Sequence, residues 1–293
     1  MRKPWEAERR VDLELARKLI RERSPEVGAA TVERIGEGWD NVAYLVDRAW
    51  VYRFPRGELP ARLLANECEF LPRISGRLPL PVSVPEAVGA PTADFPWPVA
   101  RHRYVAGTTA DRARLTDTER GALARPLGEF LRALHDLHVE GLPGDLIGRM
   151  DPEKRVPKAR ERLDALADLG VIPKPDPWLP LLASLPRSPL PPCPLHGDFY
   201  SRQLVLAEDR SLAGVIDWGD IHSGDPACDL MVAFAFVPRA EFEAGYGPIG
   251  EATAKLARFR ALSHTLGVTL YAHDIGDEDL LREGRLALER LRS

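Results

Sequence analysis

The sequence predicts an α+β protein with two lobes, a small antiparallel β lobe with one helix over residues 1–105 and a larger, mainly helical lobe over residues 106–293. Three observations lead to this prediction. The chain has 293 residues, which is long for one compact domain. Short β-branched and aromatic runs dominate its first third, and apolar residues at helical spacing dominate the rest. Gly107 marks the change, so a hinge is expected near residues 104–107.

The first lobe reads as a small antiparallel sheet with one inserted helix. Asp12 is the expected cap of an amphipathic helix over residues 12–22. Asp47 and Arg48 are the two residues between neighbouring apolar runs, a spacing that favours a hairpin. A second helix is expected at residues 59–75. The strands are expected at residues 31–35, 42–46, 49–54, 84–89 and 98–105.

The second lobe opens with a capping box from Thr116 to Glu119, followed by leucines at helical spacing. Pro126 lies inside that pattern, where it should kink the helix or mark its true start. The proline-dense stretch 173–194 favours an extended connection. A hairpin is expected from residues 203–206 and 212–217, and further helices at residues 151–169, 226–237, 251–271 and 277–291.

Composition bounds the class of protein and its partners. Three cysteines without a CxxC pair argue against a disulfide framework or a zinc knuckle. The longest apolar run, 230–237, is too short to span a membrane, and the charged N-terminus has no signal core, so a cytoplasmic location is expected. Net charge is −4, with +2 in residues 1–105 and −6 in residues 106–293. The chain has no basic face for nucleic acid, and the acidic part reads either as a solvated surface or as a site for a cationic substrate.

Two short motifs in the second lobe suit phosphoryl transfer. The first is His-Gly-Asp at residues 196–198 with Gln203 five residues beyond Asp198, and the second is Ile-Asp-Trp-Gly at residues 216–219. Phosphoryl transfer needs a carboxylate beside the attacking hydroxyl and metal ligands that hold the triphosphate. A short hairpin between Gln203 and Asp217 would bring two oxygen ligands to one side of a cleft, which is enough protein ligation for Mg²⁺.

These motifs resemble the catalytic and metal-binding loops of the aminoglycoside phosphotransferase family, which has a bilobal protein-kinase-like fold. The resemblance extends over about residues 31–290. Gly-Glu-Gly-Trp-Asp-Asn at 36–41, Tyr-Arg-Phe-Pro-Arg at 52–56 and Asn-Glu-Cys-Glu-Phe-Leu at 66–71 are similar to the small lobe of the aminoglycoside 2''-phosphotransferases. Asp-Pro-Ala-Cys-Asp at 225–229 matches the segment after the family's metal-binding aspartate.

The resemblance implies a role for each matching residue. Asp198 would be the catalytic base or orienting carboxylate, and Asp217 and Gln203 would bind Mg²⁺. Arg53 would contact the phosphates of ATP or GTP, held by Glu67 from the inserted helix. The loop that ends at Asn41 would cover the phosphates, and the hinge from Arg103 to Val105 would bind the purine base.

Two residues depart from the family pattern. Gln203 stands where Asn or His is usual, and Arg53 replaces the more common Lys. The amide oxygen of Gln can still bind Mg²⁺, and a guanidinium still binds phosphate, so we expect activity to survive. Three other polar residues are interpreted as structural: His196 as a loop-shaping residue, Asp229 as a buried acceptor that braces the catalytic loop, and His135 as a core residue.

The expected function is therefore transfer of the terminal phosphoryl group of a nucleoside triphosphate to a hydroxyl of a small molecule, with an aminoglycoside as the first choice of acceptor. A macrolide kinase and a metabolic kinase for small alcohols remain open, because the same loops serve them. A nucleotide-binding pseudokinase is the alternative of a different class, kept open by Gln203. Oligomeric state does not follow from the sequence.

Overall fold

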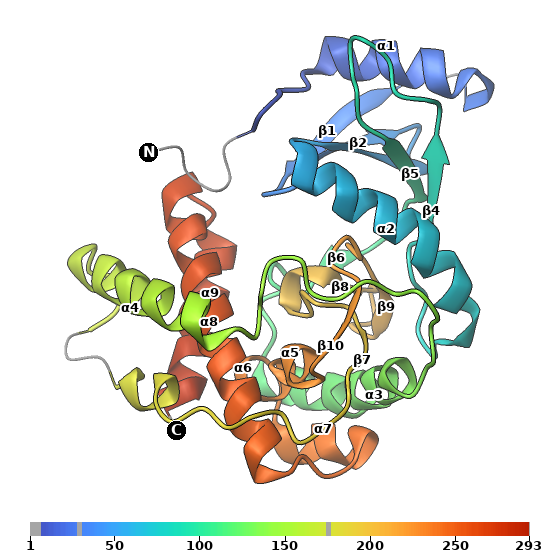
Figure 1. Ribbon diagram of the computed structural model, residues 1–293. Coiled ribbons are helices and arrows are strands. Elements are labelled where there is room, and N and C mark those ends of the chain that lie inside the picture. Colours follow the sequence, from blue (N-terminus) through green and yellow to red (C-terminus); the bar gives the residue numbers. More distant parts are fainter. Residues whose placement is uncertain (1–6, 28–30, 174–176, 293) are drawn as a thin grey trace. The chain divides into compact units, whose positions relative to one another are not determined.

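The computed structural model describes residues 7–27, 31–173 and 177–292, which divide into two compact units (Figure 1). The first, called here the N-terminal unit, contains residues 1–76, 81–106 and 216–221. The second, the C-terminal unit, contains residues 77–80, 107–215 and 222–293. Residues 216–221, which the sequence placed in the second lobe, group with the first unit, where Asp217 contacts Arg53.

The N-terminal unit is built on a five-stranded antiparallel sheet with strand order β1-β2-β3-β5-β4. Its strands are β1 (Val32–Glu37), β2 (Asn41–Val46), β3 (Trp50–Pro55), β4 (Pro85–Val88) and β5 (Val99–Arg103). Each strand lies within two residues of an expected one at its start, and the expected antiparallel sheet is confirmed.

Side-chain alternation gives this sheet two different faces. Tyr52 and Phe54 of β3 belong to an apolar core with Leu19 and Ile20 of α1 (Leu13–Arg23). Arg53, between them, points to the opposite face, as period-two alternation requires. There it meets Glu67 of α2 (Glu58–Ile74), the helix that packs against β3, β4 and β5 (Figure 1).

The turn between β2 and β3 contains one residue more than the sequence predicted. Asp47 and Arg48 have φ angles of 49° and 54°, in the left-handed region used by tight turns. The N–H of Ala49 donates to the carbonyl of Val46 over 3.0 Å and closes the turn. Ala49 therefore belongs to the turn, and β3 begins at Trp50.

The C-terminal unit is mainly helical. Its helices are α3 (Asp117–His135), α4 (Pro152–Asp168), α5 (Ala227–Leu230), α6 (Val232–Ala235), α7 (Arg239–Tyr246), α8 (Glu251–Ile275) and α9 (Glu278–Arg292). The strands β6 (Thr108–Thr109), β8 (Leu204–Leu206) and β9 (Leu212–Val215) form one small sheet, and β7 (Cys193–Leu195) pairs with β10 (His222–Gly224). Short 3₁₀ helices lie at Leu179–Leu182 and Ser201–Gln203 in this unit, at Pro25–Val27 in the N-terminal unit, and at Ser75–Arg77 where the two units divide.

Helix α8 is the centre of this unit. It is buried along most of its length, and it packs against α4, α5, α6 and α9. A helix with apolar residues on all sides needs neighbours on all sides, and the surrounding helices provide them. Within the described part of the chain, no helix is long and apolar enough to cross a membrane.

Several sequence expectations for this unit need correction. The capping box at Thr116 is confirmed, and α3 begins at Asp117, so Pro126 lies inside the helix and does not mark its start. Residues 226–237 form two short helices, α5 and α6, where one was expected. Helix α7 was not predicted. The extended stretch 173–194 includes a 3₁₀ turn and the start of β7, and its residues 174–176 lie outside the described ranges.

Helices α3 and α7 approach each other closely because each has a glycine at the contact. A Cβ atom on Gly128 would collide with the carbonyl of Phe242 and lie 2.8 Å from the Tyr246 nitrogen. A Cβ atom on Gly245 would collide with the carbonyl of Arg125. The obstacle in both cases is backbone, which cannot rotate away.

We therefore expect Gly128→Ala to lower the free energy of unfolding by about 1–3 kcal/mol, the range for overpacked sites. Gly121 is the matched control, because it lies in the same helix and a Cβ there would meet nothing within 4 Å. Gly121→Ala should instead raise stability by up to about 1 kcal/mol through helix propensity. Urea unfolding of both variants, followed by circular dichroism, measures the difference, and equal midpoints would contradict the close contact.

Candidate active site

A buried carboxylate binds the backbone of the loop that follows β7. Asp229 of α5 is fully buried, and its two oxygens accept the backbone N–H groups of His196 at 2.7 Å and Gly197 at 2.8 Å. A backbone bound in this way has little freedom to shift. The interpretation of Asp229 as a buried acceptor that braces this loop is confirmed.

His135 extends this brace into the core. Its Nε2 lies 3.5 Å from a carboxylate oxygen of Asp229, and its Nδ1 lies 2.9 Å from the hydroxyl of Tyr246. Burial works against ionisation of Asp229, but the hydrogen bonds from His135 and Gly197 outweigh it and lower the pKa of Asp229. The expected core role of His135 is thereby confirmed.

Both carboxylate oxygens of Asp198 have hydrogen-bond partners. Gln203 donates its Nε2 to Oδ2 at 3.2 Å, and His264 lies with its Nε2 2.9 Å from Oδ1. The guanidinium of Arg260 is 3.8 Å from the same Oδ1. Burial would raise the pKa of Asp198, but these positive and hydrogen-bonding partners prevail and hold it well below its usual range. Asp198 is therefore ionised at neutral pH and able to accept a hydrogen bond or a proton.

Sequence reasoning missed His264 and Arg260. They lie one turn apart on α8, so their side chains share a face of that helix. Arg260 also donates to the carbonyl of Gly197 at 3.1 Å. The available signal was weak: Arg260 and the run Ser-His-Thr at 263–265 are polar residues in a helix that is otherwise mostly apolar. Such residues need partners when they are buried.

Gln203 and Asp217 flank the expected hairpin. β8 begins one residue after Gln203, β9 ends two residues before Asp217, and the paired ends are Leu204 and Val215. The hairpin itself is confirmed. Because the carboxylate of Asp198 can only accept, the Gln203 amide turns its nitrogen to that residue, and its oxygen is the atom available to a metal.

Asp217 has the features of a functional carboxylate. Its φ is 61°, an uncommon backbone conformation for a residue other than glycine, and such conformations cluster at functional sites. Its side chain is 48% exposed, so the oxygens are accessible. An exposed carboxylate and an amide oxygen are the hard oxygen donors that Mg²⁺ prefers, so the residue types fit this ion.

Arg53 joins two carboxylates within the N-terminal unit. It donates Nη1 to both oxygens of Glu67, at 3.0 and 2.7 Å, and Nη2 to Oδ1 of Asp217. The expected pair between Arg53 and Glu67 is present, whereas the contact with Asp217, 164 residues away, was not foreseen. The side chains of Arg53 and Glu67 are 10% and 0% exposed, so this is a buried pair.

Electrostatics around Glu67 are set by its burial. Burial raises the pKa of Glu67 to about 7, and the charge of Arg53 limits the rise. His102 of β5 lies beside the pair, 4.0 Å from Glu67. Burial, and to a smaller extent repulsion from Arg53, lowers the pKa of His102 to about 3. His102 is thus neutral at physiological pH, and Arg53 is the charged partner of Glu67.

We expect Arg53→Ala to raise the nucleotide KM and to leave acceptor binding unchanged, because the guanidinium predicted to contact the phosphates is lost. Glu67→Ala should do part of the same damage, since Arg53 then has only Asp217 to hold it. Isothermal titration of both variants and of the double variant gives the coupling energy. Additive effects would remove the ion pair from the nucleotide site. Melting temperatures provide the control for folding, since breaking a buried pair destabilises by roughly 3–5 kcal/mol.

The other residues predicted to bind the nucleotide lie at or near the ends of strands. Asn41 begins β2, and its buried Oδ1 has no hydrogen-bond partner among the described residues. Arg103 ends β5, stacks its guanidinium 3.8 Å from the ring centre of Trp50, and accepts the Ser83 hydroxyl on its carbonyl. Val105 follows two residues later and is partly exposed. The base-binding role of this segment stays a prediction.

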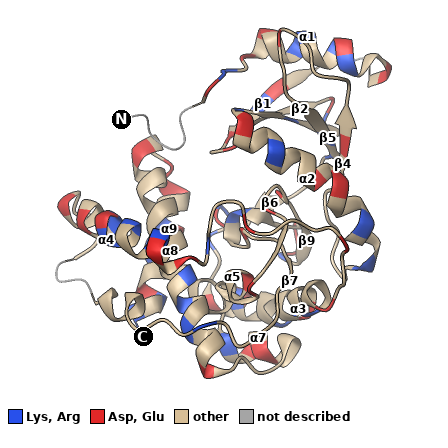
Figure 2. Cartoon of the chain, viewed as in Figure 1, with Lys and Arg blue, Asp and Glu red and all other residues tan. Residues whose placement is uncertain are grey.

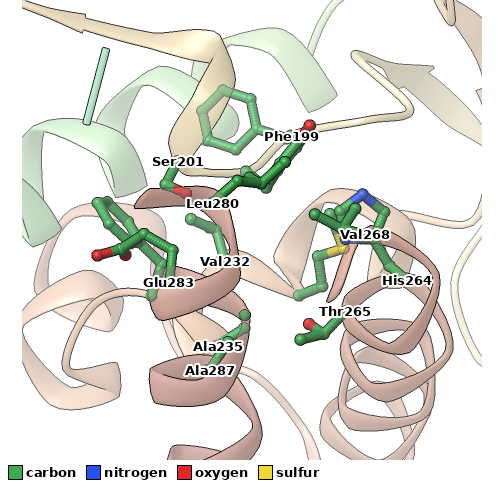
Figure 3. Close-up of a pocket in the computed structure, with 14 residues that line it drawn as sticks. Phe199, Ser201, Val232, Ala235, His264, Thr265, Val268, Leu280, Glu283 and Ala287 are labelled. Atoms are coloured by element: carbon green, nitrogen blue, oxygen red, sulfur yellow. The ribbon is translucent and has the colours of Figure 1, made fainter. Parts of the chain in front are cut away.

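A cavity of about 40 Å³ adjoins the catalytic loop inside the C-terminal unit (Figure 3). Tyr200 and Ser201 of the loop form one wall, and His264 forms another. Glu283 is its one acidic lining residue, and Arg120 binds that carboxylate on both oxygens at 2.8 and 2.9 Å. The rest of the lining is mainly apolar, with Met231, Val232, Ala235, Phe236, Val268, Leu280 and Ala287.

Solved structures with the same fold come from antibiotic phosphotransferases. The GDP complex of wild-type aminoglycoside 2'-phosphotransferase-IIIa is 23% identical, with a TM-score of 0.69, over 96% of this chain and 99% of that one. The GDP and kanamycin complex of APH(2")-IIia is 24% identical, with a TM-score of 0.66, over 94% and 97%. Macrolide 2'-phosphotransferase type I is 18% identical, with a TM-score of 0.53, over 95% and 98%. The expected kinase-like α+β fold is confirmed.

The fold and the family match together define a small-molecule phosphotransferase. A family model described as the phosphotransferase enzyme family matches residues 31–262, most of the chain. The protein therefore belongs to this phosphotransferase family.

Proposed function

We propose that this phosphotransferase moves the terminal phosphoryl group of ATP or GTP to a hydroxyl group of an antibiotic. The observation that carries the proposal is the state of Asp198, an ionised carboxylate fixed on both oxygens at the end of a braced loop. A carboxylate of this kind can accept a hydrogen bond from an attacking hydroxyl and hold that hydroxyl in line with the phosphate.

The nucleotide side of the proposal assigns three groups of residues. Arg53, held by Glu67, contacts the phosphates, and the loop that ends at Asn41 covers them. The segment 103–105 receives the purine base. Asp217 and Gln203 hold Mg²⁺, which neutralises charge on the phosphates when bound. Solved structures of the same fold were obtained with GDP and with ADP, which supports a nucleotide site but leaves both bases as candidates here.

For the acceptor we propose an aminoglycoside first. The C-terminal part of the chain is acidic, which favours a polycation. Structures that share the fold at TM-scores of 0.66 and 0.61 were solved with kanamycin and gentamicin. Both points concern overall charge and fold, so they support the class of acceptor without identifying the contacts.

A macrolide is the second candidate, and the apolar side chains beside the loop favour it. Two acidic residues near the start of α9 have arginine partners: Asp277 lies 3.8 Å from Arg202, and Asp279 contacts Arg114 and Arg282. Figure 2 shows both signs of charge along α9. Glu283 in the cavity is likewise bound by Arg120. An apolar wall without free negative charge suits an acceptor that carries alkyl groups.

Salt dependence separates the two acceptors. We expect binding of an aminoglycoside to weaken steeply between 0.1 and 1 M salt, where the Debye length falls from about 10 Å to about 3 Å. Binding of a macrolide by apolar contact should change little. Titration of kanamycin and erythromycin at both salt concentrations, with the phosphorylation rate measured in parallel, tests the assignment.

A metabolic alcohol kinase or a pseudokinase would give different results in the same assay. If neither antibiotic binds saturably while simple amino alcohols are phosphorylated, the metabolic kinase replaces our proposal. If no acceptor is phosphorylated and Mg²⁺-dependent nucleotide hydrolysis is also absent, the chain is a nucleotide-binding protein without transferase activity.

A further inference from the structure

The hydrogen bond between His264 and Asp198 is a feature that the family match does not cover. The matched segment ends at residue 262, and His264 lies beyond it on α8. The bond joins residues 66 positions apart and has a length of 2.9 Å. The side chain of His264 is only 10% exposed, so water competes weakly for this contact.

The chemistry of the two groups fixes the direction of this bond. A carboxylate is an acceptor only, so Nε2 of His264 must carry the hydrogen and donate it to Oδ1. Burial lowers the pKa of His264, although the carboxylate of Asp198 acts in the opposite direction. His264 is therefore a hydrogen-bond donor that fixes the Asp198 carboxylate.

The surroundings of His264 hold the ring in this position. The ring of Tyr200, from the loop itself, lies against it edge to face at 4.7 Å between ring centres. One helical turn earlier, Arg260 donates to the carbonyl of Gly197. Two successive turns of α8 thus bind the loop, one through its backbone and one through the Asp198 side chain.

We propose that His264 is a positioning residue for phosphoryl transfer. By binding Oδ1, it sets the rotation of the Asp198 carboxylate and directs Oδ2 toward the acceptor hydroxyl. Oδ2 accepts a longer hydrogen bond, 3.2 Å, from Gln203. In a reaction that depends on alignment more than on covalent chemistry, a misplaced carboxylate slows the chemical step. The inference rests on the proposed role of Asp198.

The test uses substitutions that differ in the reach of one donor. His264→Leu keeps the volume and removes the donor. His264→Gln places an amide N–H near the position of Nε2, whereas the shorter His264→Asn reaches only the position of Nδ1. We expect kcat to fall roughly 10- to 100-fold in the Leu and Asn variants, with the nucleotide KM within about threefold of wild type. The Gln variant should keep at least about a third of the wild-type kcat.

Two controls separate positioning from folding. His273→Leu makes the same substitution at an exposed site of α8 and should leave kcat and melting temperature unchanged. In an Asp198→Asn background, His264→Leu should cause no further loss of kcat, because its effect passes through Asp198. An equal further loss there, or a Gln variant as slow as the Leu variant, overturns the proposal.

A spectroscopic measurement makes the test independent of the acceptor. Nitrogen-15 NMR of histidine-labelled protein distinguishes a protonated ring nitrogen from a bare one, and the His264 signals are identified by their loss in His264→Gln. The proposal requires hydrogen on Nε2 of His264, and hydrogen on Nδ1 alone refutes it. If this hydrogen is present but no acceptor is phosphorylated, the proposed function fails while the contact itself stands.

Discussion

Asp198→Asn is expected to lower kcat on the order of 10²-fold or more, the scale of general-base and positioning effects. The wild-type carboxylate accepts from Gln203 on one oxygen and from His264 on the other. An amide has one oxygen and one NH₂ group, so it can accept on one side only. The Asn variant therefore loses the charge beside the attacking hydroxyl. It also loses one of the two hydrogen bonds that orient the side chain at position 198.

The measurement is steady-state kinetics with the acceptor that the phosphorylation assay identifies, together with nucleotide titration by calorimetry. Nucleotide affinity should stay within about threefold of wild type, since Asp198 is assigned to the acceptor side. Asp164→Asn, at an exposed position of α4, is the control for a lost surface charge. A fully active Asp198→Asn enzyme would remove this residue from the reaction.

Asp217→Ala should abolish Mg²⁺-dependent nucleotide binding, the second large effect. A carboxylate contributes a full negative charge to the ion, and the ion links the phosphates to the protein. Gln203→Ala should weaken binding less, because a neutral amide contributes less charge. The same substitution also removes a hydrogen bond to Asp198, so its kcat should fall more than its nucleotide affinity.

Calorimetry with and without Mg²⁺ gives both quantities. Asp209→Ala is the matched control, because Asp209 lies at the turn of the same hairpin, where it bonds only to the neighbouring Ser211 in the contacts described. Binding to Asp217→Ala should become independent of Mg²⁺. If Gln203→Ala lowers nucleotide affinity as much as Asp217→Ala does, Asp217 is not the more important of the two predicted Mg²⁺ ligands, contrary to our prediction.

The sequence predicted the parts of this protein that depend on local pattern. Short β-branched and aromatic runs predicted the five strands of the first sheet, and the capping box placed the start of α3 within one residue. In both cases, neighbouring residues carry the physical signal. The brace from Asp229 to the loop at His196, 33 residues away, was also predicted, but with the help of the family resemblance.

Contacts between distant segments were not predictable in the same way. His264 meets Asp198 across 66 residues, and Arg53 meets Asp217 across 164. Neither contact follows from helix periodicity, which places a side chain on a face but does not say what covers that face. The break between α5 and α6 was missed for a related reason, since an apolar run with helical spacing carries no signal for its interruption at Met231.

The glycine contact between α3 and α7 limits how this protein can vary. At Gly128 and Gly245 the atoms in the way belong to the backbone of the opposite helix, so no change of a neighbouring side chain makes room for a larger residue. Compensation would require the two helices to move apart, which would disturb every other contact between them. In a library that samples all residues at both positions, selection for a folded protein should return glycine at each, and single variants at these sites should have few suppressors elsewhere in the chain.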